Sequence, residues 1–167
     1  SPWMQKLPGG LIHVNVVGCA LFAAISGSSA ATVATVGKMS IPELRKRKYP
    51  EKILLGSLAG SGTLGLLIPP SIILIIYGVT VQESIAKLFI AGIIPGIMIA
   101  LIFMSYVIIW SLINKKSMPK YVENFSFLEK IKKSKQLLPV IILISAVIGS
   151  IYTGVATATE AASLGVV

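Results

Sequence analysis

Long apolar stretches separated by short charged segments dominate the pattern of hydrophobic and polar positions in this chain. Four stretches contain no Asp, Glu, Lys or Arg: residues 7–37, 53–82, 88–114 and 136–159. A helix that spans the hydrocarbon core of a bilayer needs roughly 20 apolar residues, and each stretch is longer than that. We therefore predict an all-α protein that crosses a membrane several times.

The first stretch is interrupted near its centre by the polar sequence Ser-Gly-Ser-Ser at residues 26–29. Gly and Ser disfavour a continuous helix, because Gly is flexible and Ser competes for backbone hydrogen bonds. The pattern favours a re-entrant helical hairpin with apolar arms over residues 10–25 and 30–36 and its tip near mid-membrane, where irregular backbone must be buried in protein or face water. The alternative is one long spanning helix whose small residues pack against a neighbour.

The second stretch would be about 45 Å long as one helix, against a hydrocarbon core of about 30 Å, and it contains two consecutive prolines. Without an N–H, Pro69 leaves the carbonyl of Gly65 without its helical donor. Pro70 does the same to the carbonyl of Leu66, and Pro69 also disfavours a helical conformation at Ile68. We expect a transmembrane helix that is broken in mid-membrane and leaves these three carbonyls without partners; the alternative is a helix that is only kinked.

The charge distribution predicts which segments face the cytoplasm. The net charge is +9, and most basic residues lie in segments 38–52 and 115–135. Basic segments between spanning helices are typically cytoplasmic, so the connection with Glu83 and Lys87, which has no net charge, should lie outside. Nucleic-acid binding is the competing interpretation of basic clusters, but these flank membrane-length stretches and contain few aromatic residues.

Composition excludes several functional classes. The chain is 54% hydrophobic and 13% charged, which is incompatible with a cytosolic globular enzyme, a disordered chain or a disulfide-rich secreted domain. It has one His (His13), one Cys (Cys19) and no Asp. No zinc cluster, internal disulfide or pair of aspartates can be assembled from this set, so we expect no enzymatic activity.

These observations divide the chain into six segments, and we expect it to be an internal piece of a longer protein. They are a re-entrant hairpin (1–37), a basic cytoplasmic loop (38–52), a broken transmembrane helix (53–82), a kinked transmembrane helix (83–114), a basic cytoplasmic connector (115–135), and a transmembrane segment with the start of the next helix (136–167). The connector is either an amphipathic helix at the inner membrane surface or a solvated linker.

Unpaired carbonyls in an apolar setting favour a bound alkali cation, as in the discontinuous helices of secondary transporters. The half-helix that restarts at Pro70 and Ser71 would present its N-terminus at the same depth. Its dipole, its free N–H groups and the Ser71 hydroxyl suit a carboxylate. The residues alone therefore indicate a site for a cation and an organic anion.

Three strings, "ISGSSAATVATVG", "GTLGLLIPPSIILIIYGV" and "SIAKLFIAGIIPGIM", occur in this order. Together with "YTGVATATEAAS", they resemble the large membrane subunit of TRAP (tripartite ATP-independent periplasmic) transporters. One departure is Ala158, where that family usually has Pro. The resemblance implies an elevator-type permease with inverted repeats in the bacterial inner membrane, which couples uptake of an organic acid anion, such as sialic acid or a C4-dicarboxylate, to sodium. The implied partners are a small membrane subunit, separate or fused, and a periplasmic substrate-binding protein.

The resemblance also implies residue roles. One Na⁺ would lie between the hairpin tip and the unwound helix, and the substrate carboxylate would lie beside it. The implied sodium ligands are Ala23, Ser26, Gly65, Ile68 and Pro69, and the implied substrate-binding residues are Ser26, Ser28 and Ser71. Glu160 would cap the last helix with Thr157 or contact an ion path. A single-component anion–sodium symporter of related hairpin architecture and a non-transporting membrane scaffold remain as alternatives.

Overall fold

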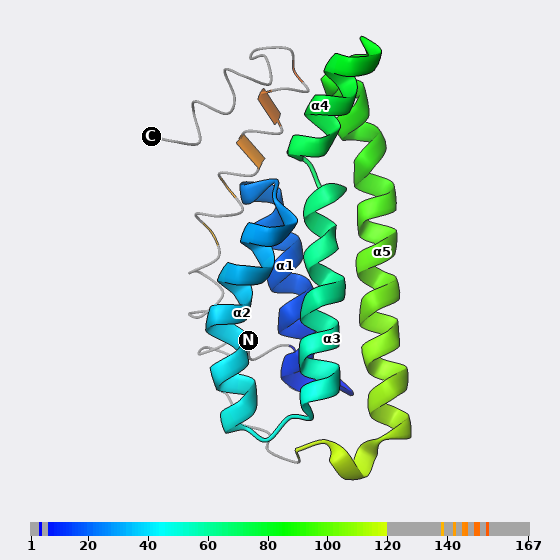
Figure 1. Cartoon of the computed structure of the whole chain (residues 1–167). Helices are drawn as coiled ribbons and strands as arrows, with labels where there is room; N and C mark the ends of the chain where they lie inside the picture. The colour runs from blue at the N-terminus through cyan, green and yellow to red at the C-terminus, as the bar shows by residue number, and fades with distance from the viewer. Residues whose placement is uncertain are drawn as a thin grey trace.

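The computed structural model describes residue 4, residues 7–119 and isolated positions between 138 and 153. Every regular element in this part of the chain is helical, as expected (Figure 1). The main helices are α1 (His13–Ser26), α2 (Ser29–Lys46), α3 (Glu51–Gly62), α4 (Ile72–Val81) and α5 (Ile85–Ile113). Short 3₁₀ helices accompany them, among which are η2 (Gly10–Ile12), η3 (Thr63–Leu66) and η4 (Lys115–Ser117).

The first apolar stretch forms two helices, α1 and α2, which pack side by side and run in opposite directions (Figure 1). Gly27 ends α1 in the left-handed conformation, with a φ of 58°, and its N–H donates to the carbonyl of Ala23 at 2.9 Å. Ser28 is the N-cap of α2, and its hydroxyl accepts from the N–H of Ala31. The alternative of one long helix is therefore wrong: this stretch is a helical hairpin whose tip is residues 26–29.

The basic segment 38–52, which we expected to be a loop, is mostly helical. α2 continues through its greater part, and only a short connection separates α2 from α3. Leu44 of this segment is buried and belongs to a core cluster, and Glu43 pairs with Arg47 one turn later at 2.6 Å. Apolar packing and an i,i+4 ion pair thus extend the helix beyond the point where the charge pattern changes.

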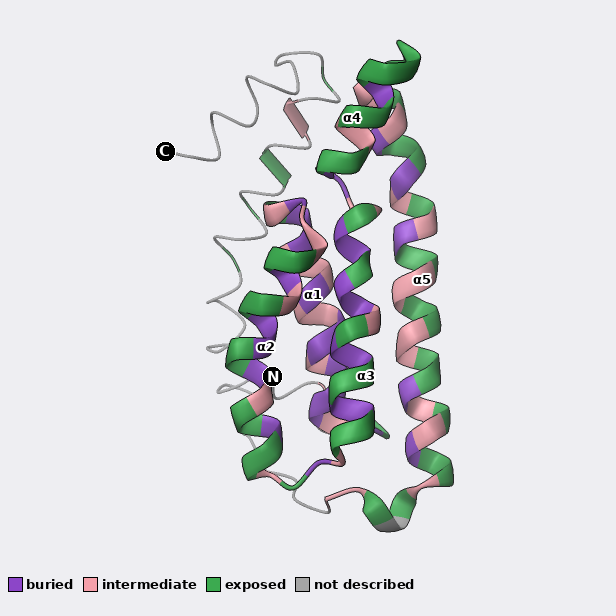
Figure 2. Ribbon diagram, viewed as in Figure 1, coloured by how far each residue is buried: buried purple, intermediate pink, exposed green. Residues whose placement is uncertain are grey.

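The core lies where α1 contacts α2 and α3, and Figure 2 shows buried residues on the surfaces of these helices that face one another. One buried cluster joins η2 to α2, α3 and α5, and consists of Leu11, Ile12, Leu44, Tyr49, Ile53, Leu54 and Val107. A polar bridge lies within the bundle: the Asn15 side-chain amide donates to the Leu54 carbonyl at 3.2 Å and to the Ser57 hydroxyl at 3.0 Å. Hydrogen bonds between helices stabilise packing in membranes.

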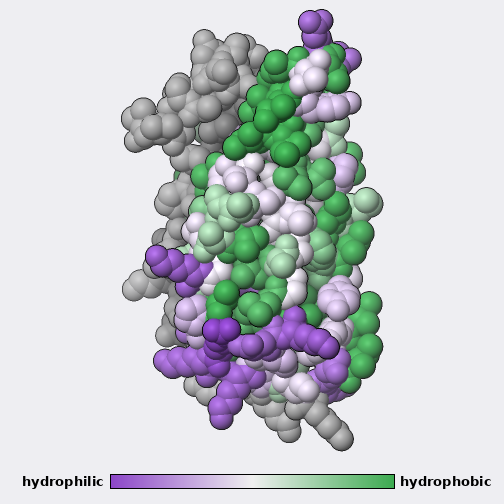
Figure 3. All heavy atoms as spheres, in the orientation of Figure 1, coloured by the Kyte–Doolittle hydropathy of each residue, from purple (hydrophilic) through white to green (hydrophobic). Residues whose placement is uncertain are grey.

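Within the described residues, α5 is the helix that is long and apolar enough to cross a membrane, with a mean hydropathy of 2.5. It continues through Pro95 and exposes much of its apolar surface, as Figure 2 shows. α1 with η2, and α4, are apolar but shorter. Hydrophilic residues gather instead at the end of the molecule where α3 begins (Figure 3). The predictions for residues 120–137 and for Thr157, Ala158 and Glu160 lie outside the described residues.

Candidate functional site

The second apolar stretch is interrupted between η3 and α4, which confirms the predicted break. The carbonyl of Leu64 accepts from the N–H groups of Leu67 at 3.1 Å and Ile68 at 2.9 Å, and the regular helix then stops. Residues 67–71, called here the interruption, connect the two halves. Among the described residues, no hydrogen-bond donor contacts the main-chain oxygens of Gly65, Ile68 or Pro69. The two prolines remove the N–H groups that a continuous helix would have provided.

The carbonyl of Leu66, which we also expected to be unpaired, has a partner. The hydroxyl of Ser71 donates to it at 2.8 Å, so this side chain bridges the interruption. Ser71 is fully buried, and its hydroxyl proton is already in use. Sequence reasoning placed this hydroxyl toward a substrate carboxylate. In the structure this hydroxyl instead bonds to the main chain five residues earlier, at Leu66. A direct role in anion binding stays a prediction.

The hairpin tip lies directly against the interruption. A Cβ atom on Gly65 would be 3.0 Å from the Ser28 carbonyl carbon and from the Ser29 nitrogen. A Cβ atom on Gly27 would be 2.7 Å from the carbonyl oxygen of Pro70. The N–H of Ile72, the first residue of α4, donates to the Gly27 carbonyl at 3.4 Å. Two segments far apart in the sequence therefore meet through main-chain atoms, and only glycine permits this approach at residues 27 and 65.

α5 supports the interruption from another direction. A Cβ atom on Gly92 would be 2.8 Å from the Leu67 carbonyl oxygen, and one on Gly96 would be 3.1 Å from the Ile68 side chain. The Gly-x-x-x-Gly spacing places both glycines on one helix face. The interruption is thus held between the hairpin tip and α5.

Ser26, expected to bind both the cation and the substrate, belongs to a hydrogen-bond network within the tip. Its hydroxyl lies 3.0 Å from that of Thr32, and the N–H of Ser28 approaches it at 3.4 Å. Thr32 also donates to the Ser28 carbonyl at 2.7 Å and is fully buried. Sequence reasoning missed Thr32. The available signal was a hydroxyl one turn after the N-cap Ser28.

Unused hydrogen-bonding groups remain around this junction. The Ser29 hydroxyl is buried and has no partner among the described residues. The N–H groups of Ile73 and Leu74, in the first turn of α4, likewise have no acceptor there. Sequence reasoning placed Ser29 in the tip but gave it no role. Free N–H groups at a helix N-terminus attract anions.

Of the five expected cation ligands, Ser26 lies in the tip, Gly65 packs against Ser28 and Ser29, and Ile68 and Pro69 belong to the interruption, while Ala23 lies one turn before the tip. Ala23 differs from the others because its carbonyl already accepts from Gly27. The atoms that could coordinate a cation here are main-chain and hydroxyl oxygens, the ligands that hard cations prefer. The described residues contain no group of three His, Cys, Asp or Glu side chains that could bind a transition metal. The donor chemistry of the junction therefore fits a hard cation of low charge.

The described residues thus combine a helical hairpin, an interrupted helix with free carbonyls and one exposed helix long and apolar enough to cross a membrane, features that occur together in secondary transporters with discontinuous helices. Sequence comparison is more specific. The family described as "Tripartite ATP-independent periplasmic transporter, DctM component" matches residues 4–167, and the chain belongs to this family.

Several relatives are named as permeases. The chain is 40% identical to the C4-dicarboxylate TRAP transporter large permease protein DctM of Pseudomonas aeruginosa, over 95% of the chain and 36% of the relative. It is 38% identical to the isethionate TRAP transporter permease protein DctMQ of Oleidesulfovibrio alaskensis, over 96% and 25%. It is 39% identical to the sialic acid TRAP transporter permease protein SiaT of Haemophilus influenzae, over 92% and 24%. The chain thus spans about a third or less of these relatives.

Proposed function

We propose that this chain is part of the large permease subunit of a sodium-coupled transporter that imports an organic acid anion. Its role is to form one half of the ion and substrate site. The observation that carries the proposal is the contact between the hairpin tip and the interruption, where the carbonyls of Gly65, Ile68 and Pro69 have no donor among the described residues. The relatives are named for C4-dicarboxylate, isethionate and sialic acid, all of which are acids.

Sodium is the proposed occupant of the junction. The free carbonyls of Gly65, Ile68 and Pro69 supply oxygen ligands, and Ser26 and Ala23 supply ligands from the hairpin. Unwound carbonyls in discontinuous helices bind Na⁺ in secondary transporters. A cation bound between the two segments would hold the tip closed on the interruption, so sodium binding would favour one conformation of the site.

The anion would lie beside this cation, near Ser26 and Ser28 at the tip and Ser71 at the start of α4. The free N–H groups of Ile73 and Leu74 would attract its carboxylate or sulfonate. A neighbouring Na⁺ strengthens that attraction. This coupling gives a physical reason for sodium dependence, because each ligand raises the affinity for the other by the same factor.

The transport step is proposed to be elevator-type. The hairpin tip is joined to η3, the interruption and α4 by main-chain contacts, and the interruption also packs on α5. A unit joined in this way is suited to move as one body across the membrane. The proposed setting is the bacterial inner membrane, with a small membrane subunit, separate or fused, and a periplasmic substrate-binding protein that delivers the acid.

Uptake by the complete subunits in proteoliposomes tests the proposal. We expect accumulation of the acid only with an inward Na⁺ gradient and with the substrate-binding protein present, without ATP. The acid is chosen by screening C4-dicarboxylates, sialic acid and sulfonates against that binding protein. Uptake without the binding protein would indicate a single-component symporter. Sodium-dependent uptake that is unchanged in Ser26→Ala and Pro69→Ala, with normal membrane insertion, would assign this chain a scaffold role.

A further inference from the structure

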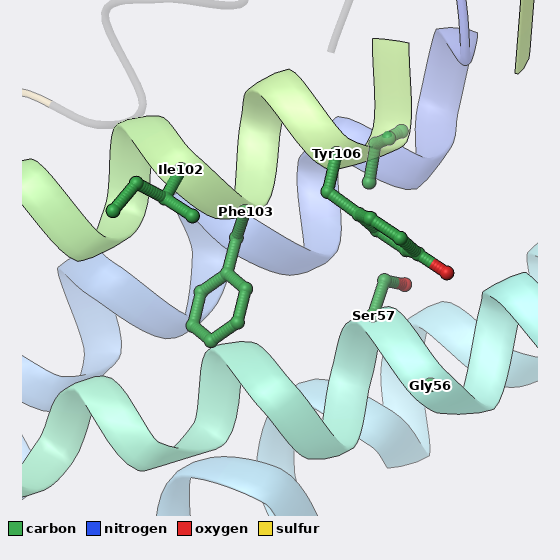
Figure 4. A pocket seen from close by; sticks show the side chains of 6 residues that line it. Gly56, Ser57, Ile102, Phe103 and Tyr106 are labelled. Atoms are coloured by element: carbon green, nitrogen blue, oxygen red, sulfur yellow. The ribbon is translucent and has the colours of Figure 1, made fainter. Parts of the chain in front are cut away.

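A groove of about 270 Å³ lies between α3 and α5, away from the junction of tip and interruption. It is lined by Gly56, Ser57, Ile102, Phe103, Tyr106 and Val107. Figure 4 shows Phe103 and Tyr106 extending from α5 toward α3, and Ser57 facing them. The Ser57 hydroxyl is already used, because it donates to the Leu54 carbonyl and accepts from Asn15. The groove therefore suits an apolar occupant.

Two glycines on α3 show why the groove is open. A Cβ atom on Gly60 would lie 3.2 Å from the Phe103 ring, so this glycine packs closely against α5. A Cβ atom on Gly56, one turn earlier, would have no atom within 4 Å. Small residues at such spacing normally let two membrane helices approach each other. Here only one of the two does so, and the helices leave a space at the other.

The groove lies in the half of α3 and α5 nearer the basic end of the molecule. Lys52 lies one turn before Gly56, on the same side of α3, and Lys115 follows the end of α5. Figure 3 shows the hydrophilic residues gathered at this end and apolar residues above them. The two carboxylates that the structure describes at this end are occupied, because Glu43 pairs with Arg47 at 2.6 Å and Glu51 with Arg45 at 2.8 Å.

Lys52 and Lys115 are exposed, and among the described residues neither has a carboxylate partner. Exposed lysines at the basic end, toward which α3 and α5 extend from the groove, match with it the two parts of an anionic phospholipid. Basic pockets between transmembrane helices on the cytoplasmic side are typical sites for anionic headgroups. Tyr106, with 57% of its surface exposed, adds an amphipathic ring to the groove.

We propose that this groove binds an anionic phospholipid, with an acyl chain between α3 and α5 and its phosphate at Lys52 and Lys115. The site is separate from the proposed ion and substrate site. Its occupancy would link α3 to α5 beside the basic end. A lipid is the occupant proposed, rather than a second protein segment, because an apolar groove near exposed lysines matches an acyl chain with an anionic headgroup.

Native mass spectrometry of the complete permease tests the proposal, with phosphatidylglycerol and phosphatidylcholine supplied in equal amounts. We expect wild type to retain phosphatidylglycerol preferentially. Gly56→Leu should abolish retention by filling the groove. Lys52→Gln, an exposed substitution that leaves the fold intact, should weaken retention about fivefold, the factor expected for one basic residue at an anionic surface.

Two matched controls accompany these variants. Ala59→Leu adds the same side chain at an exposed position of α3 outside the groove, and Lys87→Gln removes a charge at the opposite end of α5. Both should retain lipid as wild type does. Equal retention of the two lipids, unchanged retention in Gly56→Leu, or a wild type without lipid because another segment covers the groove would each overturn the proposal.

Discussion

The carbonyl of Gly27 accepts a hydrogen bond from the N–H of Ile72 at 3.4 Å and so joins the hairpin tip to the second half of the interrupted helix. This contact satisfies one of the first-turn N–H groups of α4, which have no partner within their own helix. It leaves the N–H groups of Ile73 and Leu74 available, and it places the free carbonyls of the interruption beside the tip.

Gly27→Ala should destabilise the protein by about 1–3 kcal/mol, the cost of a non-glycine residue held in a strained backbone conformation. The φ of 58° disfavours any side chain, and the new Cβ would lie 2.7 Å from the Pro70 oxygen. Thermal unfolding of the purified permease in detergent measures the effect. The control is Gly18→Ala in α1, where the Cβ would make an ordinary 3.5 Å contact with Val36. Equal melting temperatures in both variants would contradict the assignment of the tip.

Gly65→Ala should raise the Na⁺ concentration that half-saturates uptake about tenfold, the scale of the affinity loss when groups that support metal ligands are altered. The added methyl group presses on Ser28 and Ser29 at 3.0 Å and moves the tip away from the carbonyls. Uptake measured across a range of Na⁺ concentrations gives the half-saturating value. Gly56→Ala adds the same methyl group where no atom lies within 4 Å, and it should behave as wild type. A shift shared by both variants would show a general effect of alanine.

Asn15 and Ser57 should be energetically coupled across α1 and α3 by roughly 0.6 kcal/mol, the average for hydrogen bonds between membrane helices. The Asn15 amide donates to the Ser57 hydroxyl at 3.0 Å inside the bundle. A double-mutant cycle with Asn15→Leu and Ser57→Ala, measured by unfolding in detergent, isolates this term. Additive effects of the two substitutions would mean that the bridge does not stabilise the bundle.

Lowering the pH should reduce the stability of the C-terminal end of α2, because Glu43 becomes protonated. The hydrogen bond and charge of Arg47 lower the pKa of this carboxyl. Because the folded-state pKa is depressed, its stabilisation is present above the unfolded-state pKa and is lost as pH falls through the folded-state value. Hydrogen exchange of α2 amides at neutral and acid pH should show this loss in wild type and not in Glu43→Gln. The effect should be small, since the pair is at the surface.

Local chemistry was enough to predict the break and the hairpin tip. The consequence of Pro69 and Pro70 for the carbonyl of Gly65 depends only on the missing N–H groups, and it is confirmed. The tip at Gly27 follows from the conformational freedom of glycine between two apolar arms. Such rules need no knowledge of which other segments lie nearby.

Nonlocal contacts account for what the sequence did not reveal. The bond from Ser71 to the Leu66 carbonyl depends on how the chain folds back across the interruption. The position of the Thr32 side chain depends on its hydrogen bonds to the Ser26 hydroxyl and the Ser28 carbonyl, which form only when the tip folds back. The helix over residues 38–46 depends on packing of Leu44 in the core, which outweighs the charge pattern used to predict a loop.

The most direct test of the central claim is whether sodium closes the hairpin tip on the interruption. A Ser28→Cys variant of the complete permease, in a background without other cysteines, is treated with a water-soluble thiol reagent in Na⁺ or in choline at equal ionic strength. We predict that Na⁺ slows modification severalfold and that Gly65→Ala removes this protection while Gly56→Ala retains it. Equal modification rates in Na⁺ and choline, in a variant whose uptake still requires Na⁺, would contradict the claim.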